Sequence, residues 1–565
     1  MPMIFTLKRE MKFNWQSNHR LIFYTGWSLL SFLQAYLTGL QDDEAYYWVY
    51  SKFLSWGYFD HPPMIALLIK TGTLILPGEL GVRFMIVILS TLTLLIAEKL
   101  IQTKDYLLFY SICLSLPILQ VSGFMAVPDI PLIFFTSLFF LVYRSFIKKN
   151  SIINTISLGL VITGLLYSKY HGVLIIFFTL LSNIKLLRSA AIYISGIIAL
   201  VLFTPHLIWQ YDHDWISFKF HFFERNAEYY DLRVTMEYVL GQFLLVGPIA
   251  GIIFFTGTFL YRTKNSFERS LKYTAVGIFS FFLLSTFKGR VEANWTSPVL
   301  IPMIVLTHNY LLEHERWKIW LYRLLPLSVV LVLVIRFFMI ADVLPIDAVV
   351  ERFHAWKRWP LVLKNKTKDL PVVFKNSYQR ASQYWFHTGQ ISYSLNDYRE
   401  RMNNYNIWPI EDSLLGKKVY IMDIYRLNSF KDSMQARLWI VGFSPDSNFQ
   451  SFAKLLIKCE PNNYILNRGE KLTLDLIADI PGHYRNYLLY QQKTDEQIII
   501  GVFKGKQRIK EVNLNLTLLQ LVRNPRQQVV IYPDMQKGRY SLIFAIRSST
   551  GLFTQNSERI GIVIK

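Results

Sequence analysis

The sequence predicts an α-helical polytopic membrane protein of about eleven spans, followed by a C-terminal mixed, β-rich soluble domain. Residues of the set AVILMFWYC make up 52% of the 565 positions and charged residues 18%, below the ~25% of ordinary soluble domains. Apolar runs near the ~20 residues needed to cross a bilayer recur as far as Ile340. From about Leu344 onward these runs shorten and polar residues alternate with them, which is typical of strands.

Composition and charge exclude several classes of protein. The chain is not intrinsically disordered, because it has far more apolar surface than collapse requires. Two cysteines, Cys113 and Cys459, exclude a disulfide scaffold or a cysteine-rich metal domain, and we expect them not to pair. The net charge of +21 favours Lys and Arg that hold loops on the cytoplasmic side of a membrane over nucleic-acid binding.

The spans are predicted from the apolar runs. We expect them at 21–40, 81–101, 106–124, 130–146, 152–167, 172–186, 190–209, 235–261, 270–287, 295–312 and 319–341. The first run has no clear small-residue cleavage site, so we expect it to be a retained anchor. Residues 62–77 are apolar but hold Lys70 between bracketing prolines, which favours a re-entrant or interfacial helix.

The distribution of basic residues predicts the orientation. With the N-terminus in the cytoplasm, every predicted cytoplasmic loop is basic, as the positive-inside rule requires. An odd number of spans then places the C-terminal domain outside the cytoplasm. All the polar clusters that could carry chemistry fall on that same side, which predicts one shared site at the outer face of the membrane.

Three domains are expected along the chain. They are a transmembrane catalytic domain over 1–343, a mixed α/β segment over 344–430 and a β-rich domain over 431–565. Strands are predicted at 417–425, 437–443, 471–477, 497–503, 528–532 and 538–547, with Gly, Pro, Asn and Asp between them.

The first loop outside the cytoplasm opens with acidic residues. Asp42, Asp43 and Glu44 directly follow the first predicted span, where a solvated loop is the simplest explanation. The segment 45–58 is rich in Tyr and Trp and predicts a helix lying in the headgroup layer, which would hold the carboxylates at that depth. His61 then precedes paired prolines, which predict either an anion-binding helix start or a plain turn.

Further polar residues lie at the outer ends of later predicted spans. Asp129 lies next to Pro128, where a helix cap is the competing interpretation. Lys169 and His171 lie at another of these ends, where a lysine often extends to the interface.

A last cluster precedes Trp295 and consists of Lys288, Arg290, Glu292 and Asn294. A Lys–Arg pair on the outer side of the membrane is contrary to the positive-inside rule, so its presence there requires an explanation. One reason is phosphate binding; the structural alternative is pairing with Asp43, Glu44 or Asp129.

Several of these motifs resemble one family. Asp43-Glu44-Ala45-Tyr46-Tyr47-Trp48 and Trp56-Gly57-Tyr58-Phe59-Asp60-His61-Pro62-Pro63-Met64 resemble the first outer loop of integral-membrane GT-C glycosyltransferases. The similarity is to the bacterial branch related to dolichyl-phosphate-mannose protein mannosyltransferases (family 39) and to the aminoarabinose transferases that modify lipid A. Pro128-Asp129, Lys169-Tyr170-His171 and Asn294-Trp295 stand where that branch carries comparable signals, and residues 376–386 resemble a segment in the soluble tail of some members.

The resemblance implies a GT-C-like fold and an inverting glycosyltransferase of the bacterial inner membrane. Such an enzyme moves a sugar from a polyprenyl-phosphate sugar to an acceptor hydroxyl on a protein, lipid A or a surface glycan. Carried over by position, Asp43 is the general base. Glu44 would orient Asp43 or bind a metal, and Asp129 would position the acceptor or hold a cation.

The same resemblance requires cations around the leaving lipid phosphate. His61, Lys169 and Arg290 are the candidates, and His171, Lys288, Glu292 and Asn294 are further site candidates. Histidine stands at 61 where related aminoarabinose transferases carry another basic residue, so its charge depends on pH. No cofactor is assigned; a divalent metal stays open, because family members differ in their need for one.

Two other functions stay open on the sequence. A transporter or flippase of lipid-linked sugars could use the same residue types, although its polar residues should lie near the middle of the membrane in broken helices. A non-catalytic membrane scaffold could bind partners through the C-terminal domain.

Overall fold

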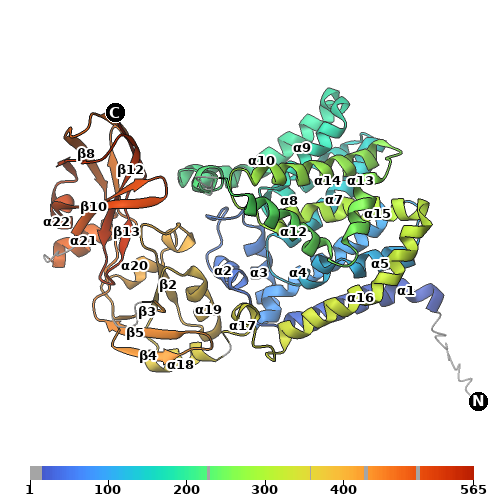
Figure 1. Cartoon of the computed structure of the whole chain (residues 1–565), viewed down its shortest axis with the longest axis horizontal. Helices are drawn as coiled ribbons and strands as arrows, with labels where there is room; N and C mark the ends of the chain where they lie inside the picture. The colour runs from blue at the N-terminus through green and yellow to red at the C-terminus, as the bar shows by residue number, and fades with distance from the viewer. Residues whose placement is uncertain (1–14, 225–229, 357, 426–429, 492–496) are drawn as a thin grey trace, which may run out of the picture. The chain divides into compact units, whose positions relative to one another are not determined.

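The computed structural model describes residues 15–224, 230–356, 358–425, 430–491 and 497–565 (Figure 1). The chain forms two compact units. Unit 1 comprises Met1–Thr38, Leu67–Leu207 and Asp231–Ala341, and unit 2 comprises Gly39–Ala66, Ile208–Tyr230 and Asp342–Lys565. Two segments from within the predicted transmembrane domain therefore fold together with the C-terminal part of the chain.

Unit 1 is helical. Its elements are α1 (Trp15–Leu37), α3 (Met64–Ile75), α4 (Gly78–Leu100), α5 (Tyr106–Ser115), α6 (Pro117–Val121), α7 (Asp129–Lys148), α8 (Ile152–Ser168), α9 (Gly172–Ser182), η1 (Ile184–Arg188), α10 (Ala190–Asp212), α12 (Leu232–Val246), α13 (Gly251–Leu260), α14 (Ser266–Ser285), η3 (Ala293–Val299), α15 (Leu300–Glu313) and α16 (Glu315–Ile340). The first residues of α3 and the last of α10 belong to unit 2.

Four of these helices, α4, α7, α10 and α16, are long and apolar enough to cross a membrane. A fifth span is formed if the pair α12 and α13, bent by 101°, counts as one. Four shorter helices, α3, α5, α8 and α9, are also apolar. Helices thus occupy the predicted apolar runs, while the number of eleven spans stays a prediction.

Two of the predicted spans break at a proline. The run 106–124 divides into α5 and α6 at Leu116, which is extended because Pro117 follows it. The run 235–261 divides at Gly247, which has φ +134° and precedes Pro248. A side chain at position 247 would be strained by this φ and would lie 3.2 Å from the Pro117 ring. The dipeptide therefore fixes the bend.

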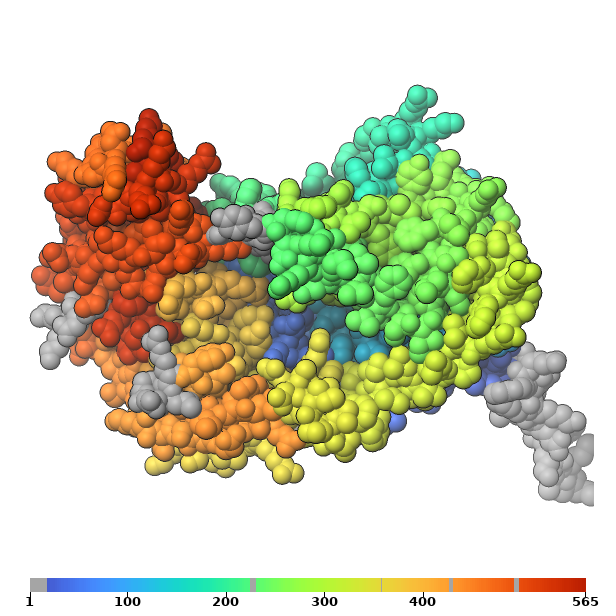
Figure 2. Space-filling view, in the orientation of Figure 1, coloured from blue at the N-terminus to red at the C-terminus, as the bar shows by residue number. Residues whose placement is uncertain are grey.

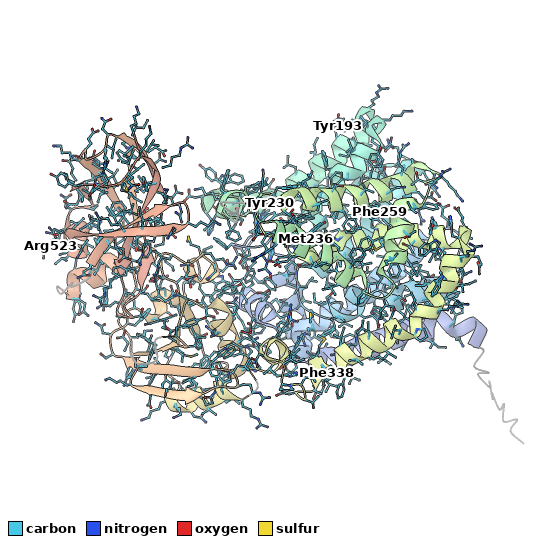
Figure 3. All side chains as sticks on the ribbon, viewed as in Figure 1. Tyr193, Tyr230, Met236, Phe259, Phe338 and Arg523 are labelled. Atoms are coloured by element: carbon cyan, nitrogen blue, oxygen red, sulfur yellow. The ribbon has the colours of Figure 1, made fainter. Side chains whose placement is uncertain are left out.

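Large apolar side chains cover the outside of α10 and α16. Only 22% of the most apolar window of each helix is buried. On α16 the exposed residues include Trp320, Leu327 and Phe337, and Figure 2 shows the yellow atoms of this helix on the visible surface. Tyr193 on α10 and Phe259 on α13, labelled in Figure 3, are 56% and 40% exposed. Surfaces of this kind suit contact with lipid rather than water.

Unit 2 contains a five-stranded mixed sheet. Its strands are β1 (Val372–Lys375), β2 (Ser392–Leu395), β3 (Val419–Asp423), β4 (Asp432–Gln435) and β5 (Ile440–Asp446), in the order β2-β1-β3-β5-β4. β1 is parallel to β2 and β3, whereas β5 is antiparallel to β3 and β4. The sheet continues to Asp446 and so passes the domain boundary that the sequence predicts at 430.

The short helices of unit 2 are α2 (Asp42–Tyr50), α11 (Ile216–Lys219), η2 (Phe220–Glu224), α17 (Asp347–Phe353), α18 (Trp359–Thr367), α19 (Tyr378–Thr388), η4 (Asn404–Asn406), α20 (Ile410–Leu414), α21 (Gly482–Gln491) and α22 (Leu518–Arg523). Of these, α19 connects the parallel strands β1 and β2, as a parallel pair requires a crossover.

The last part of unit 2 is a β-sandwich. A six-stranded sheet has the order β10-β9-β12-β14-β7, with β13 paired to β12, and faces a three-stranded sheet of order β11-β8-β6. The strands are β6 (Leu456–Cys459), β7 (Asn463–Leu466), β8 (Leu472–Asp479), β9 (Gln497–Lys504), β10 (Gln507–Thr517), β11 (Arg526–Ile531), β12 (Gly538–Arg547), β13 (Phe553–Gln555) and β14 (Ile560–Ile564).

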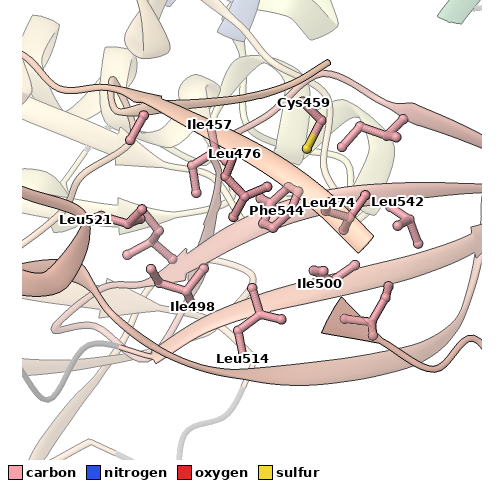
Figure 4. Close-up of a cluster of buried hydrophobic side chains, with 14 of the residues drawn as sticks. Ile457, Cys459, Leu474, Leu476, Ile498, Ile500, Leu514, Leu521, Leu542 and Phe544 are labelled. Carbon is pink, nitrogen blue, oxygen red and sulfur yellow. The ribbon is translucent and has the colours of Figure 1, made fainter. Parts of the chain in front are cut away.

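Alternating side chains of the two sheets form one core (Figure 4). Leu474 and Leu476 of β8 pack with Ile498 and Ile500 of β9 and with Phe544 of β12. This alternation is the pattern from which the strands were predicted, and the prediction for 538–547 is confirmed by β12. Both cysteines are buried and form no disulfide, as expected.

The aromatic segment after Glu44 corrects one expectation. Instead of an interfacial helix over 45–58, α2 ends at Tyr50 and its residues from Ala45 onward are buried inside unit 2. Trp48 packs edge-on against Trp385 at 6.0 Å between ring centres, and Tyr46 lies 4.4 Å from Tyr378. These rings form the interior of a folded unit, because α19 covers the helix.

Candidate active site

The acidic residues of the first loop stand at the beginning of α2. Glu44 is fully buried, and its Oε2 accepts a hydrogen bond from the backbone N–H of Gln41 at 3.0 Å. This contact is half of a capping box, so Glu44 closes the first turn of the helix. Asp42 is half-buried and accepts a hydrogen bond from Gln383 Nε2 at 3.0 Å. Asp43, between them, is exposed to solvent.

Asp43 has the titration behaviour that a general base requires. Crowding by protein atoms raises the pKa of its carboxyl to about 6, with a further rise from the negative charges of Asp42 and Asp60. The positive charges of Arg401 and Arg352 act in the opposite direction. A carboxyl with a pKa close to neutral, and reachable from solvent, can accept a proton from a substrate hydroxyl.

Asp60 anchors the loop that follows α2. This carboxylate is 6% exposed and accepts hydrogen bonds from the hydroxyls of Tyr46 at 3.3 Å and Tyr50 at 3.4 Å. Its other oxygen accepts from Arg401 Nη1 at 3.0 Å. The buried charge is therefore both paired and hydrogen-bonded, which is the condition under which burial is tolerated.

Arg401 is a residue that sequence reasoning missed. Its guanidinium lies 5.2 Å from the ring centre of Phe220 and 5.3 Å from that of Tyr378, whose hydroxyl it also contacts at 3.2 Å. Burial alone would lower the pKa of Arg401, but the charge of Asp60 and the neighbouring tyrosines hold that pKa above its usual range. It lies 341 positions from Asp60 in the chain, and no local motif announces the pair.

His61 adjoins this anchored loop. Its half-buried ring packs edge-on against Tyr47 with 5.6 Å between centres, and its carbonyl accepts from the Tyr58 N–H at 3.2 Å. A second histidine, His221, contacts the same loop: its Nε2 is 3.1 Å from the carbonyl oxygen of Asp60. The predicted helix start is present, since α3 begins at Met64 directly after the paired prolines.

Unit 1 brings together a second group of predicted residues. Lys169 Nζ lies 2.9 Å from Asp129 Oδ1, and both side chains are almost fully buried. Ser297 donates to the same oxygen at 3.0 Å, and Asn294 donates to Oδ2 at 3.0 Å. Asp129 is thus the centre of a hydrogen-bonded network that joins α7, the end of α8 and η3. Ser297 was not predicted, because an isolated serine carries no signal.

The remaining predicted residues of unit 1 take no part in this network through any contact described below. His171 packs against Trp295 at 5.2 Å and against Phe282 at 5.0 Å between ring centres. Arg290 is largely exposed and its Nε lies 3.3 Å from Glu292 Oε1, so its partner is not one of the three carboxylates that the sequence suggested. Lys288 is also exposed.

The predicted site residues therefore fall into two groups. Asp43, Glu44 and His61 belong to unit 2, and the predicted residues from Asp129 to Asn294 belong to unit 1. That the two groups line one cavity stays a prediction. The catalytic roles of Glu44 and Asp129 and the phosphate-binding role of Lys169 also stay predictions, beside the helix cap and the buried network just described.

No metal site is evident in the described part of the chain. No group of three or more His, Cys, Asp and Glu side chains in residues 15–224, 230–356, 358–425, 430–491 and 497–565 is arranged to hold an ion. Glu44, the residue suggested as a metal ligand, instead accepts the backbone N–H of Gln41.

Comparison with known proteins shows which proteins the chain resembles. Residues 60–209 match the profile of the family described as dolichyl-phosphate-mannose-protein mannosyltransferase. The fold is similar to that of ArnT from Cupriavidus metallidurans in its apo crystal structure, with a TM-score of 0.56 and 12% identity over 76% of this chain and 98% of that chain. The resemblance to integral-membrane GT-C glycosyltransferases of the ArnT-like branch is thus confirmed, and so is the predicted fold class.

Two further comparisons concern a ligand-bound structure of the same ArnT and one other protein. The same ArnT bound to undecaprenyl phosphate gives a TM-score of 0.54 at 11% identity, over 76% of this chain and 98% of that one. Lipid A galacturonosyltransferase RgtD of Rhizobium johnstonii is 25% identical over 286 residues, which is 47% of this chain and 59% of that protein. The match thus spans less than two thirds of that relative. Together with the long apolar helices, this fold supports a multi-pass membrane protein.

Proposed function

We propose that this protein is a glycosyltransferase that takes a sugar from an undecaprenyl-phosphate-linked donor and attaches it to an acceptor hydroxyl. The family profile, the galacturonosyltransferase relative and the likeness to the undecaprenyl-phosphate-bound structure support this class of reaction. The observation that carries the proposal is Asp43, a solvent-accessible carboxyl whose pKa is raised to about 6. The resemblance of its motif to the first outer loop of GT-C enzymes implies the role of the base for this residue.

The proposed step exchanges one bond for another. The acceptor oxygen attacks the anomeric carbon while the bond from that carbon to the phosphate oxygen breaks, and the configuration inverts. Asp43 accepts the hydroxyl proton, and the lipid phosphate leaves with the bonding electron pair. His61, in the same unit as Asp43, is the first candidate to stabilise this leaving group. We assign Lys169 a positioning role instead, because its charge is already paired with Asp129.

We further propose that the reaction takes place at the outer face of the inner membrane, with the N-terminus in the cytoplasm and the C-terminal domain outside. Lipid A is the favoured acceptor class, because the curated relative is a lipid A galacturonosyltransferase. A protein hydroxyl and a surface glycan are the alternative acceptors. The sugar is a hexose, a hexuronic acid or a pentose.

A reconstituted assay tests this function. Vesicles that contain the purified chain, a labelled undecaprenyl-phosphate sugar and lipid A are expected to yield labelled lipid A and one free undecaprenyl phosphate per sugar transferred. Serine/threonine peptides and glycans replace lipid A in parallel samples. If the labelled donor instead crosses the bilayer without an acceptor and without release of lipid phosphate, the protein is a transporter and the proposal is wrong.

The pH dependence of transfer provides a second prediction. Asp43 acts as a base only when ionised, so kcat/KM is expected to fall about tenfold per pH unit below an apparent pKa of about 6. Arg401→Gln removes a positive charge that lowers the pKa of Asp43. The acid limb of the profile is therefore expected to move to higher pH in this variant.

Two controls isolate the charge effect. The double variant Asp60→Asn/Arg401→Gln removes charges that act on Asp43 in opposite directions, so its acid limb should lie closer to that of the wild type. Arg399→Gln alters an arginine that pairs with Asp397 and should leave the limb in place. An acid limb that is the same in wild type and Arg401→Gln would contradict the assignment of Asp43 as the titrating base.

A further inference from the structure

Unit 2 contains a cavity of about 590 Å³ that the proposed reaction does not use. Its lining comes from the beginning of α18 with the residues before it, and from the end of β4 with the turn that leads to β5. Asp342, at the start of the unit's C-terminal part, also lines the cavity. The lining residues used below are Asp342, Arg358, Trp359, Val362 and Arg437. The volume lies within the range of ordinary small-molecule sites.

The lining of the cavity favours an anionic group. Arg358 makes no ion pair with the described residues, and Arg437 is paired with Asp342 at 3.0 Å. The positive end of the α18 dipole adds to this field, since Arg358 is the N-cap residue of the helix. Two guanidinium groups and a helix N-terminus against one carboxylate leave a net positive site, and guanidinium groups match phosphate geometry.

A buried donor without an acceptor gives a second, independent indication of a ligand. Trp359 lines the cavity and is 4% exposed, yet its indole Nε1–H has no hydrogen-bond acceptor among the residues that the structure describes. Buried polar groups normally have a partner. A phosphate oxygen in the cavity would supply one.

The surroundings indicate that the phosphate is carried by a lipid. Asp342 follows the last residue of α16 by two positions, and α16 is one of the helices able to cross a membrane. Because only two residues' length of chain separates them, the Cα atom of Asp342 lies within about 7 Å of the Cα atom of Ile340, the last residue of α16. Val343, Ile346 and Leu361, which are near the cavity residues along the chain, expose apolar side chains, and so does Val362, which lines the cavity. Apolar residues beside arginines are typical of surfaces that enter the headgroup layer.

From these observations we propose that the cavity between α18 and the β4–β5 turn binds the phosphate group of an anionic membrane lipid. Arg358 and Arg437 contact the phosphate oxygens, the Trp359 indole donates a hydrogen bond, and Val362 contacts the start of the acyl region. The site holds a lipid and carries out no chemistry. This proposal can therefore be tested independently of the sugar-transfer proposal.

Lipid binding to the purified full-length protein in detergent tests the proposal by native mass spectrometry. The probe is dioleoyl phosphatidic acid, and dioleoyl phosphatidylcholine has the same chains without an accessible phosphate dianion. Wild type is expected to retain phosphatidic acid in preference to phosphatidylcholine. Inorganic phosphate at the same concentration is expected not to displace it; equal displacement would show a free-phosphate site and overturn the lipid assignment.

Substitutions locate the binding. Arg358→Gln is expected to weaken phosphatidic acid binding about tenfold, and Trp359→Phe, which keeps the ring and removes the N–H, about threefold. Lys418→Gln alters an exposed cation of the same unit outside the cavity and should leave binding unchanged. Unchanged binding in both Arg358→Gln and Trp359→Phe overturns the proposal.

A gain of affinity keeps the test independent of folding defects. Asp342→Asn removes the carboxylate that is paired with Arg437 and frees that guanidinium for the lipid. Binding of phosphatidic acid is therefore expected to become a few-fold tighter, which no misfolded variant would show. Weaker binding in Asp342→Asn would contradict the proposed arrangement of charges.

Discussion

Replacement of Asp43 by asparagine is expected to lower the rate of sugar transfer by about 10²–10⁴-fold. Asparagine keeps the size and shape of the side chain but cannot take the proton of the attacking hydroxyl. The measurement is kcat/KM for labelled sugar transfer in vesicles, with donor binding followed separately. Binding of the donor should be nearly unchanged, because the lost interaction belongs to the transition state.

The same substitution is expected not to destabilise the fold. The raised pKa of Asp43 shows that its charged form is disfavoured by its surroundings. Between the ordinary carboxyl pKa and about 6, the folded protein binds more protons at this position than the unfolded chain does. The free energy of unfolding of the wild type therefore falls as pH rises through that window. Above about pH 6 the contribution of Asp43 to this free energy no longer changes with pH. Asp43→Asn removes this penalty, and its thermal midpoint at pH 7 should equal or exceed that of wild type.

Asp42→Asn is the matched control for this prediction. Asp42 is the adjacent residue in the same helical turn, and it accepts a hydrogen bond from Gln383. Asp42→Asn also removes one negative charge, one position away from Asp43. Most of the transfer activity should remain in this variant. If Asp42→Asn abolishes transfer and Asp43→Asn retains it, the base has been assigned to the wrong carboxylate.

Local patterns of the sequence predicted the elements well where one kind of packing dominates. In β8 the buried residues Leu472, Leu474, Leu476 and Ala478 alternate with less buried ones, so a period of two could be read directly. The long helices α4, α7, α10 and α16 follow unbroken apolar runs. The breaks at Pro117 and Pro248 were missed, although each follows from the missing N–H and the restricted residue before proline.

The aromatic loop after Glu44 shows where composition misled. Tyr and Trp are as typical of a protein interior as of a membrane interface, and only the partner segment decides between them. Here the partner is α19, more than 300 residues later, whose Trp385 and Tyr378 cover α2. The sequence contains no local signal for such a pairing.

Candidate site residues could be proposed one by one from the sequence, but their contacts could not. Asp43 and His61 could be proposed because their motifs are contiguous in the chain. Arg401 and Ser297 act through contacts across 341 and 168 positions, so neither could be found without the fold. For Lys169 the sequence offered an interfacial lysine or a phosphate ligand, and the structure adds a third role as the partner of Asp129.

The Lys169–Asp129 pair leads to the largest expected effect on stability. Lys169→Met is expected to destabilise the protein by about 3–5 kcal/mol, because it leaves the carboxylate of Asp129 buried without its counter-charge. Asn294 and Ser297 still donate to that carboxylate but carry no charge. Equilibrium unfolding of the purified protein in mixed detergent micelles measures the change in the free energy of unfolding.

The double variant Lys169→Met/Asp129→Asn separates loss of the pair from loss of the lysine. It removes both buried charges and keeps acceptor and donor groups for the network, so it should recover most of the stability lost in Lys169→Met. Arg290→Gln breaks an exposed pair with Glu292 and is expected to change the free energy of unfolding by only about 0–1 kcal/mol. If Lys169→Met is as stable as wild type and instead loses affinity for the lipid-linked donor, Lys169 binds the donor phosphate and its positioning role is wrong.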